Sequence, residues 1–381
     1  MPVVEGDPTT SRSRLSLPPQ ADLVPTGLIP LFCRVIRPVF FAMIQAVPPL
    51  HRPIHSDSDT DEWQIAMKRA IRSQRELRRR LGLPEAPDAD AAERFPTFVP
   101  LEMLARIRPG DANDPILRQV LADERETDQQ PGFTADPVGD LDASVAGGLI
   151  HKYHGRALLV THGACAVHCR YCFRREFPYS ETGSRRENWK PALESIRSDG
   201  TIEEVLLSGG DPLTLTDASL DRLVTSLEEI AHVRRLRLHT RLPIAIPQRI
   251  TENLVARLTE SRLVTWVVIH CNHAQEIDSA VTRATDRMIN AGLPVLNQSV
   301  LLAGVNDHAD TLVELSKALV DRRIQPYYLH QLDRVQGSAH FLVPEQRGHE
   351  LVEEMRRRLP GYAVPQYVAE HAGAANKTPL G

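Results

Sequence analysis

The sequence predicts an α/β protein whose second half forms a parallel sheet with helical crossovers. Six apolar stretches are predicted to be buried strands: residues 156–161, 204–207, 235–239, 264–270, 294–302 and 326–330. From the second onward they recur about every 30 residues, which is the length of a βα unit. Residues 218–230 and 345–359 keep the apolar spacing of three and four that is typical of one helix face. Such a series forms either a doubly wound sheet or a partial barrel, and in both the chemistry lies at the carboxyl ends of the strands.

The composition excludes several classes of protein. Of the 381 residues, 42% are apolar and 25% are charged, so the chain is not disordered throughout. Its 45 basic residues against 49 acidic ones give a net charge of −4, which provides no general attraction to nucleic acid. Five cysteines are too few, and odd in number, for a secreted disulfide scaffold. A globular protein of a reducing compartment is favoured.

The first 137 residues are less regular than the rest, because they hold 18 of the 29 prolines. We expect a proline-rich, loosely ordered leader at residues 1–55 and a helical cap at 56–148. The α/β domain is expected at 149–381. Thr97–Arg106 and Pro115–Asp123 are predicted to be short helices, and Phe133–Gly148 a connecting loop.

The leader contains an apolar stretch, residues 28–47, that has to be considered as a membrane span. Arg34 and Arg37 lie within it, and each costs roughly 2.5–3.5 kcal/mol inside a bilayer, so no span is expected. The first 20 residues also lack the basic start and apolar core of a secretory signal. We therefore expect a cytoplasmic protein, and we hypothesise that translation begins later than Met1, for instance at Met43.

Residues 61–83 are predicted to form one helix with a strongly basic face, which carries Lys68, Arg69, Arg72 and the arginines of 75–80. A solvated helix packed on the main domain is the favoured interpretation. A face that docks a macromolecule is the alternative.

A cysteine motif follows the first predicted strand, with Cys165, Cys169 and Cys172 in a C-x3-C-x2-C spacing. Three structural cysteines spaced by chance are one interpretation. A zinc site is another, although zinc sites pair C-x2-C with a distant second pair and His168 is a doubtful fourth ligand. A [4Fe–4S] cluster normally takes four cysteines, so three would leave one iron open to a substrate or cofactor.

This motif, after the first strand of a (βα)6 series, resembles that of the radical S-adenosylmethionine (SAM) enzymes. The resemblance implies a partial (βα)6 barrel in which the three cysteines bind a [4Fe–4S] cluster and the open iron chelates SAM. Reduction then cleaves SAM to an adenosyl radical, so an external electron donor of the flavodoxin or ferredoxin type is implied. The turn after the second strand, Ser208, Gly209, Gly210 and Asp211, resembles the family's SAM-binding glycine turn, where glycine lets the backbone approach the ligand.

Further segments are similar to those of the lysine 2,3-aminomutases, from about residue 60 to the end. They are HKYHGR (151–156), CFRR (172–175), RLP (241–243), PQRIT (247–251), NQSVLL (297–302), PYY (326–328) and KTP (377–379). The similarity is greatest to the subgroup of elongation factor P β-lysylation proteins. It implies conversion of (S)-α-lysine to (R)-β-lysine, through an imine of the substrate with pyridoxal phosphate (PLP). A lysine ligase then attaches the product to elongation factor P.

The resemblance assigns roles to individual residues. Lys377 matches the lysine that holds PLP, and Arg174 matches the residue that binds the substrate carboxylate. Asp333 and Glu370 match the two acids for the substrate side-chain ammonium, although free-lysine mutases have aspartate at the position of Glu370. The resemblance also implies that Lys152, which stands where larger mutases carry arginine, and Arg156 contact PLP or substrate. Asn297, Gln298 and Ser299 are either polar contacts or structural residues.

Three features depart from the family pattern: the proline-rich leader, the end of the chain four residues after Lys377, and Cys271. The larger mutases continue with a cysteine-containing extension that binds zinc. Cys271 is expected to be a buried thiol, and no role is assigned to Cys33.

Two rivals stay open at this stage. One is a mutase that acts on free lysine in metabolism, or on another amino acid such as glutamate, which the two predicted carboxylates disfavour. The other is a zinc module that docks on nucleic acid through the basic helix. We expect neither a membrane nor a nucleic-acid partner.

Overall fold

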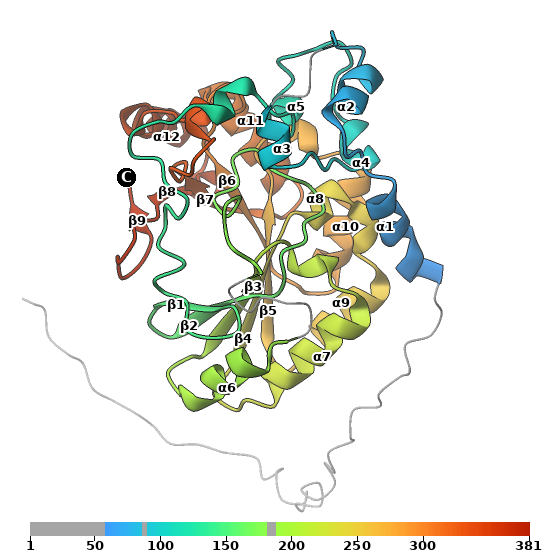
Figure 1. Ribbon diagram of the computed structural model, residues 1–381. Coiled ribbons are helices and arrows are strands. Elements are labelled where there is room, and N and C mark those ends of the chain that lie inside the picture. Colours follow the sequence, from blue (N-terminus) through green and yellow to red (C-terminus); the bar gives the residue numbers. More distant parts are fainter. Residues whose placement is uncertain (1–57, 86–89, 181–187) are drawn as a thin grey trace, which may run out of the picture. The chain divides into compact units, whose positions relative to one another are not determined.

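An open sheet organises the second half of the chain (Figure 1). The computed structural model describes residues 58–85, 90–180 and 188–381, and over these the sheet has nine strands in sequence order. They are β1 (Leu149–Tyr153), β2 (Arg156–Val160), β3 (Glu204–Ser208), β4 (Arg235–Thr240), β5 (Val264–His270), β6 (Val295–Val300), β7 (Gln325–His330), β8 (Gln366–Ala369) and β9 (Thr378–Pro379). The expectations for residues 1–55, including the stretch 28–47, Cys33 and Met43, lie outside the described residues.

The ladders from β2 to β8 are parallel, while β1 and β9 pair antiparallel at the two edges. Each parallel step is crossed by a helix, because parallel neighbours cannot be joined by a tight turn. The crossover helices are α6 (Lys190–Ser198), α7 (Asp217–Glu228), α9 (Glu252–Thr259), α10 (Ser279–Asn290), α11 (Ala309–Val320) and α12 (Glu345–Arg358). This is a partial (βα)6 barrel, as predicted, with β8 as a seventh parallel strand.

All six predicted strands are present, with ends that shift by at most two residues. Three strands were not predicted: β1, β8 and β9. They have five, four and two residues, and two of them lie at sheet edges, so their apolar patterns are too short to stand out. The predicted loop at 133–148 contains neither helix nor strand.

The described residues before β1 contain short helices: α1 (Ser58–Lys68), α2 (Gln74–Arg80), α3 (Asp90–Arg94), α4 (Leu101–Leu104) and α5 (Pro115–Arg118). The prediction of a single basic helix at 61–83 is wrong, because the helical conformation is interrupted between α1 and α2. There Ile71 exchanges backbone hydrogen bonds with Val99, at 2.8 and 2.9 Å, and Ser73 caps α2 by accepting from the Glu76 N–H. The helices expected at 97–106 and 115–123 are present but shorter, as α4 and α5.

Short elements complete the chain. They are α8 (Leu242–Ala245) and six 3-10 turns: η1 (Glu124–Thr127), η2 (Pro212–Thr214), η3 (Pro247–Arg249), η4 (Ala274–Glu276), η5 (Ala339–Phe341) and η6 (Gly361–Ala363). None of the helices in the described ranges is both long and apolar enough to cross a bilayer.

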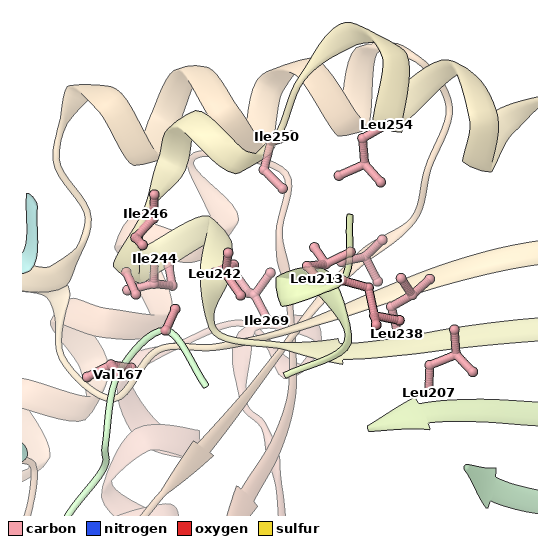
Figure 2. Packing of buried hydrophobic residues seen from close by; sticks show 14 of the residues in the cluster. Val167, Leu207, Leu213, Leu238, Leu242, Ile244, Ile246, Ile250, Leu254 and Ile269 are labelled. Atoms are coloured by element: carbon pink, nitrogen blue, oxygen red, sulfur yellow. The ribbon is translucent and has the colours of Figure 1, made fainter. Parts of the chain in front are cut away.

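The main core lies between the sheet and its crossover helices. Leu207, Leu238 and Ile269, on three neighbouring strands, are fully buried against residues of α8, α9 and the loops between them (Figure 2). Burying an aliphatic side chain of this size contributes about 1.5–3 kcal/mol. Val167, from the cysteine loop, is buried in the same cluster, beside Ile244. The core therefore anchors the loop that carries the predicted cluster ligands.

Candidate active site

A cavity of about 690 Å³ lies at the carboxyl ends of the parallel strands. Side chains from the ends of β3, β4, β5 and β7 line it, together with the loops that follow β2, β3, β7 and β8. The structure brings all thirteen sequence-predicted site residues to this cavity: Lys152, Arg156, Cys165, Cys169, Cys172, Arg174, Ser208, Gly209, Gly210, Asp211, Asp333, Glu370 and Lys377.

The three cysteines of the motif are free thiols on the cavity wall. Their loop is tied to the N-terminal segment, because the His168 N–H donates to the Phe98 carbonyl at 3.0 Å. Burial raises the pKa of Cys165, and the neighbouring Cys172 raises it further. Burial likewise raises the pKa of Cys172, to about 11. Burial therefore favours the protonated thiols of Cys165 and Cys172 when no positively charged group is bound beside them.

This donor set fits an iron–sulfur cluster better than a single metal ion. Among the described residues, no three histidine, cysteine or acidic side chains converge as the ligands of one ion. In a [4Fe–4S] cluster each cysteine binds a different iron. Three thiols that surround one opening can therefore bind a cluster without converging on a single metal ion. The Arg241 guanidinium donates to Cys169 Sγ at 2.7 Å and is held by Glu276 at 2.8 Å, which adds a fixed positive charge beside the thiols.

The glycine turn after β3 lies against the start of the cysteine loop. Gly209 has φ +117°, which strongly favours glycine, and a Cβ on Gly210 would lie 2.1 Å from the Ala164 carbonyl oxygen. The turn is closed by the Gly210 N–H, which donates to the His162 carbonyl at 2.7 Å. Two glycines therefore form a side-chain-free rim beside Cys165, where a ligand can approach the backbone.

Asp211, the last residue of this turn, is buried and holds the turn to β4. It accepts from Thr240 Oγ1 at 2.7 Å and from the Arg241 N–H at 2.6 Å. Burial raises its pKa to about 6, although these hydrogen bonds act in the opposite direction. In this geometry its carboxylate positions the turn, and its predicted contact with SAM stays a prediction.

Five charged side chains form a continuous chain of ion pairs along the cavity: Lys377, Glu370, Lys152, Asp140 and Arg174. Lys377 Nζ pairs with Glu370, whose other oxygen is 2.9 Å from Lys152 Nζ. Lys152 in turn lies 2.5 Å from Asp140, and Asp140 accepts from Arg174 Nε at 2.7 Å. Arg174 Nη1 also donates to Ser208 Oγ at 3.0 Å. The predicted PLP lysine and the predicted carboxylate-binding arginine thus stand at opposite ends of one alternating series.

The carboxyl groups of the cavity differ in charge state. Burial would raise the pKa of Glu370, but Lys377 and Lys152 hold it at about 2. Burial raises the pKa of Asp333 to about 7, with Glu370 raising it further and Lys377 and Lys152 opposing. One acid is therefore ionised at all ordinary pH values, whereas the other titrates near neutrality. The Arg156 guanidinium stacks on the Tyr153 ring at 4.7 Å, at the same wall.

Three histidines at strand ends also face the cavity: His239 on β4, His270 on β5 and His330 on β7. Their Nε2 atoms are buried without a hydrogen-bond partner among the described residues, and so is Gln298 Oε1. Burial lowers the pKa of His270 to about 4 and holds the pKa values of the other two well below the usual range. Buried polar atoms are rarely left unpaired, so this neutral layer fits a polar ligand.

Asn297, Gln298 and Ser299 on β6 were expected to be either polar contacts or structural residues, and the answer differs between the two faces of the strand. Gln298 lines the cavity. Asn297 and Ser299 point the other way and bind the Cys271 carbonyl, at 3.1 and 2.8 Å, so they are structural. Cys271 is fully buried, as predicted.

Sequence reasoning missed Asp140 and the three histidines. Asp140 lies in an irregular loop with no periodic signal, 34 residues from Arg174 in the sequence. The histidines did have a signal, because each ends a predicted strand, where chemistry gathers in parallel α/β folds.

Comparisons with known proteins give consistent results. The model of the radical SAM superfamily matches residues 159–315. The chain is 47% identical over 290 residues to the L-lysine 2,3-aminomutase of Escherichia coli K12, which covers 76% of this chain and 84% of that protein. It is 42% identical to the L-lysine 2,3-aminomutase of Haemophilus influenzae, with 84% and 96% covered. A protein of the same name from Clostridium subterminale is 35% identical, with 85% and 79% covered.

Proposed function

Because the chain belongs to the L-lysine 2,3-aminomutase family, we propose that it converts (S)-α-lysine into (R)-β-lysine by moving the amino group from C2 to C3. The observation that carries the proposal is the cavity itself. One cavity is lined by the cysteine motif and the glycine turn, and also by Lys377, Arg174 and the acids Asp333 and Glu370. These are the groups that a radical amino shift on a diamino acid requires.

Substrate recognition is proposed to use Arg174, at one end of the ion-pair series, and Glu370, which pairs with Lys377 at the other end, together with Asp333. Arg174 binds the carboxylate, since a guanidinium suits a planar carboxylate and its Nε is already fixed by Asp140. Glu370 and Asp333 bind the side-chain ammonium. Two carboxylates at that end repel a second carboxylate, which disfavours glutamate as the substrate.

The cofactors are proposed to be held as the family requires. Cys165, Cys169 and Cys172 hold the cluster, Gly209 and Gly210 offer backbone to SAM, and Lys377 holds PLP with Lys152 and Arg156 nearby. When bound, the cluster supplies the electron that cleaves SAM, and PLP supplies the π-system across which nitrogen moves.

The chain's own residues have three further tasks in this proposal. Lys377 would hold PLP through its amine, and its pairing with Glu370 keeps that amine in the cavity beside one of the acids proposed for the substrate ammonium. The three neutral histidines hydrogen-bond to ligands without adding charge to the cavity. The packed wall around Val167 keeps the cysteine loop in place.

The test is anaerobic turnover. Protein reconstituted with iron, sulfide, PLP and SAM is reduced with dithionite and given L-lysine, and β-lysine is measured by chiral chromatography with mass detection. We expect (R)-β-lysine from the wild type, none from Cys169→Ser, and no β-glutamate from glutamate. Retained β-lysine formation by Cys169→Ser would refute the radical route. About four irons per chain, rather than one zinc, would exclude the zinc alternative.

The destination of the product forms a second part of the proposal. The motif similarity to the elongation factor P subgroup supports transfer of β-lysine to that factor by a lysine ligase, in the cytoplasm. Intact mass of elongation factor P from a strain that lacks this gene tests it. We expect the β-lysyl form to disappear and to return on complementation or on feeding β-lysine. An unchanged mass would leave free metabolic β-lysine as the product's role.

A further inference from the structure

We propose that the basic surface of α1 and α2 docks a small acidic one-electron donor protein, which reduces the cluster held by the cysteine loop. We define this basic surface as Lys68, Arg69, Arg72, Arg75, Arg78 and Arg79. The inference rests on the proposed function, because reductive cleavage of SAM requires a one-electron donor. One electron passes from the reduced donor to the oxidised cluster, and no bond or proton changes in that step.

This surface is positively charged, whereas the whole chain has a negative net charge. Residues 58–80, from the start of α1 to the end of α2, contain seven basic and four acidic residues, and three of the acidic ones precede Trp63, although the chain has a net charge of −4. Arg69 pairs with Glu102, and Arg80 pairs with Glu76. For Lys68, Arg72, Arg75, Arg78 and Arg79, no described carboxylate lies within ion-pair distance. Such a local concentration of unpaired positive charge attracts and orients an acidic partner.

An exposed apolar side chain lies beside these charges. Ile65 is 50% exposed, which makes it one of five large apolar residues that are exposed in the described parts of the chain. It lies one helical turn before Arg69, whose N–H donates to the Ile65 carbonyl at 3.0 Å. An apolar centre within a charged rim is the usual composition of a protein–protein interface.

Direct contacts connect the basic surface to the cysteine loop. The Arg72 guanidinium lies 4.5 Å from the centre of the Phe98 ring, and Phe98 lies 5.6 Å from the His168 ring. His168 immediately precedes Cys169. A donor bound over Arg72 is therefore separated from a cluster ligand by two ring contacts and one peptide. Electron transfer weakens steeply with distance, so this is a favourable entry point.

The path is also fixed in place. The backbone exchange between Ile71 and Val99 holds the start of α2 beside Phe98, at 2.8 and 2.9 Å. On the other side, the His168 N–H donates to the Phe98 carbonyl, and His168 Nδ1 lies 2.6 Å from the Pro96 carbonyl. The surface and the loop therefore keep their separation when a partner binds.

The experiment separates docking from chemistry by using two reductants. Three exposed arginines of the surface are reversed together in Arg72→Glu, Arg75→Glu and Arg79→Glu. The matched control reverses Arg356, Arg357 and Arg358 to Glu, which are exposed arginines at the end of α12. A reduced bacterial flavodoxin is the protein donor, and dithionite is the small reductant. The readouts are the flavodoxin Kd by calorimetry, its salt dependence, the rate of cluster reduction by stopped-flow absorbance, and β-lysine formation.

We expect the surface variant to keep its dithionite-driven rate within about twofold of the wild type, while its Kd and apparent KM for flavodoxin rise about tenfold or more. The control triple should bind flavodoxin like the wild type. A second variant, Phe98→Leu, should keep the Kd but slow cluster reduction by flavodoxin.

Two results would overturn the inference. One is a surface variant that binds flavodoxin as tightly as the control triple does. The other is tighter binding of a transfer RNA than of flavodoxin to this surface in competition, which would make it a nucleic-acid site. A wild type that binds flavodoxin but forms no β-lysine even with dithionite would instead refute the proposed function and leave the docking measurement valid.

Discussion

Asp140 and Arg174 form a buried ion pair in which Arg174 Nε donates to Asp140 Oδ2 across 2.7 Å. The other oxygen of Asp140 is 2.5 Å from Lys152 Nζ. Burial alone would raise the pKa of Asp140, but Arg174 and Lys152 hold it below its usual value. One carboxylate from an irregular loop therefore orients two cations that face the cavity.

The first prediction concerns this carboxylate. Asp140→Asn keeps the shape of the side chain, but it leaves the buried Arg174 without its paired carboxylate and Lys152 with Glu370 as its remaining one. We expect the free energy of unfolding to fall by about 3 kcal/mol or more, because breaking a buried pair strands its partners. The KM for lysine should rise more than kcat falls, since Arg174 loses its orientation. Urea denaturation and steady-state kinetics measure both.

Asp142→Asn is the matched control, because Asp142 lies in the same loop and is exposed. It should change neither quantity by much. Asp140→Glu should recover part of the loss in KM. If Asp140→Asn matches Asp142→Asn in both measurements, the ion pair does not position Arg174.

The second prediction concerns the glycine turn. In Gly210→Ala the new methyl group would meet the Ala164 carbonyl oxygen at 2.1 Å, so the segment just before Cys165 has to move. We expect SAM binding to be lost and the iron content after reconstitution to fall. Gly200→Ala is the control, because a Cβ there meets nothing within 4 Å. Equal SAM affinity in the two variants would show that the rim is not the SAM contact.

Much of this site could be predicted because its residues follow strands with a clear period. Cys165 follows β2 and Ser208 ends β3, and the apolar runs of these strands are visible in the sequence. Lys377 and Glu370 have no such context. They could be assigned only through similarity to known mutases, because β8 and β9 are too short to produce a pattern.

Other features depend on contacts between distant segments, which a single sequence does not reveal. The break between α1 and α2 is an example, since it follows from the pairing of Ile71 with Val99. The basic residues there favour a continuous helix locally, and the tertiary contact overrides that preference. Asp140 is another example, because its partners are 12 and 34 residues away and no turn or period marks it.

The third prediction identifies the lysine that holds PLP. Of the described residues, Lys152 and Lys377 are the lysines that line the cavity. Lys152 Nζ donates to the Val138 carbonyl and pairs with both Asp140 and Glu370, so its three hydrogens are engaged. Within the described ranges, Lys377 has an ion pair with Glu370 and with no other carboxylate. A reduced PLP–protein adduct should therefore map to Lys377 by peptide mass spectrometry, and Lys377→Ala should abolish it.

Lys317→Ala, which removes an exposed lysine of α11, should leave the adduct intact. An adduct found on Lys152 in the wild type would contradict the assignment.

The last prediction is a pH dependence that arises from Asp333. Its pKa of about 7 means that its carboxyl group is mostly neutral at pH 6 and mostly ionised at pH 8. Glu370, with a pKa of about 2, stays ionised throughout, and so does the lysine side-chain ammonium, whose pKa is about 10.4. Lysine should therefore bind up to about tenfold more tightly at pH 8 than at pH 6, because the second carboxylate ionises between them. Asp333→Asn should bind weakly with no such dependence.

Lysine affinity is expected to rise with pH, whereas the free energy of unfolding of the substrate-free protein is expected to fall. Between the usual pKa of an aspartate and 7, the folded Asp333 binds more protons than the unfolded one does. The free energy of unfolding therefore falls as pH rises through that window, and Asp333→Asn removes this contribution. Calorimetric binding between pH 6 and pH 8, and thermal unfolding between about pH 4 and pH 7, test the two signs. Lysine affinity that weakens from pH 6 to pH 8 in the wild type would show that Asp333 does not bind the ammonium.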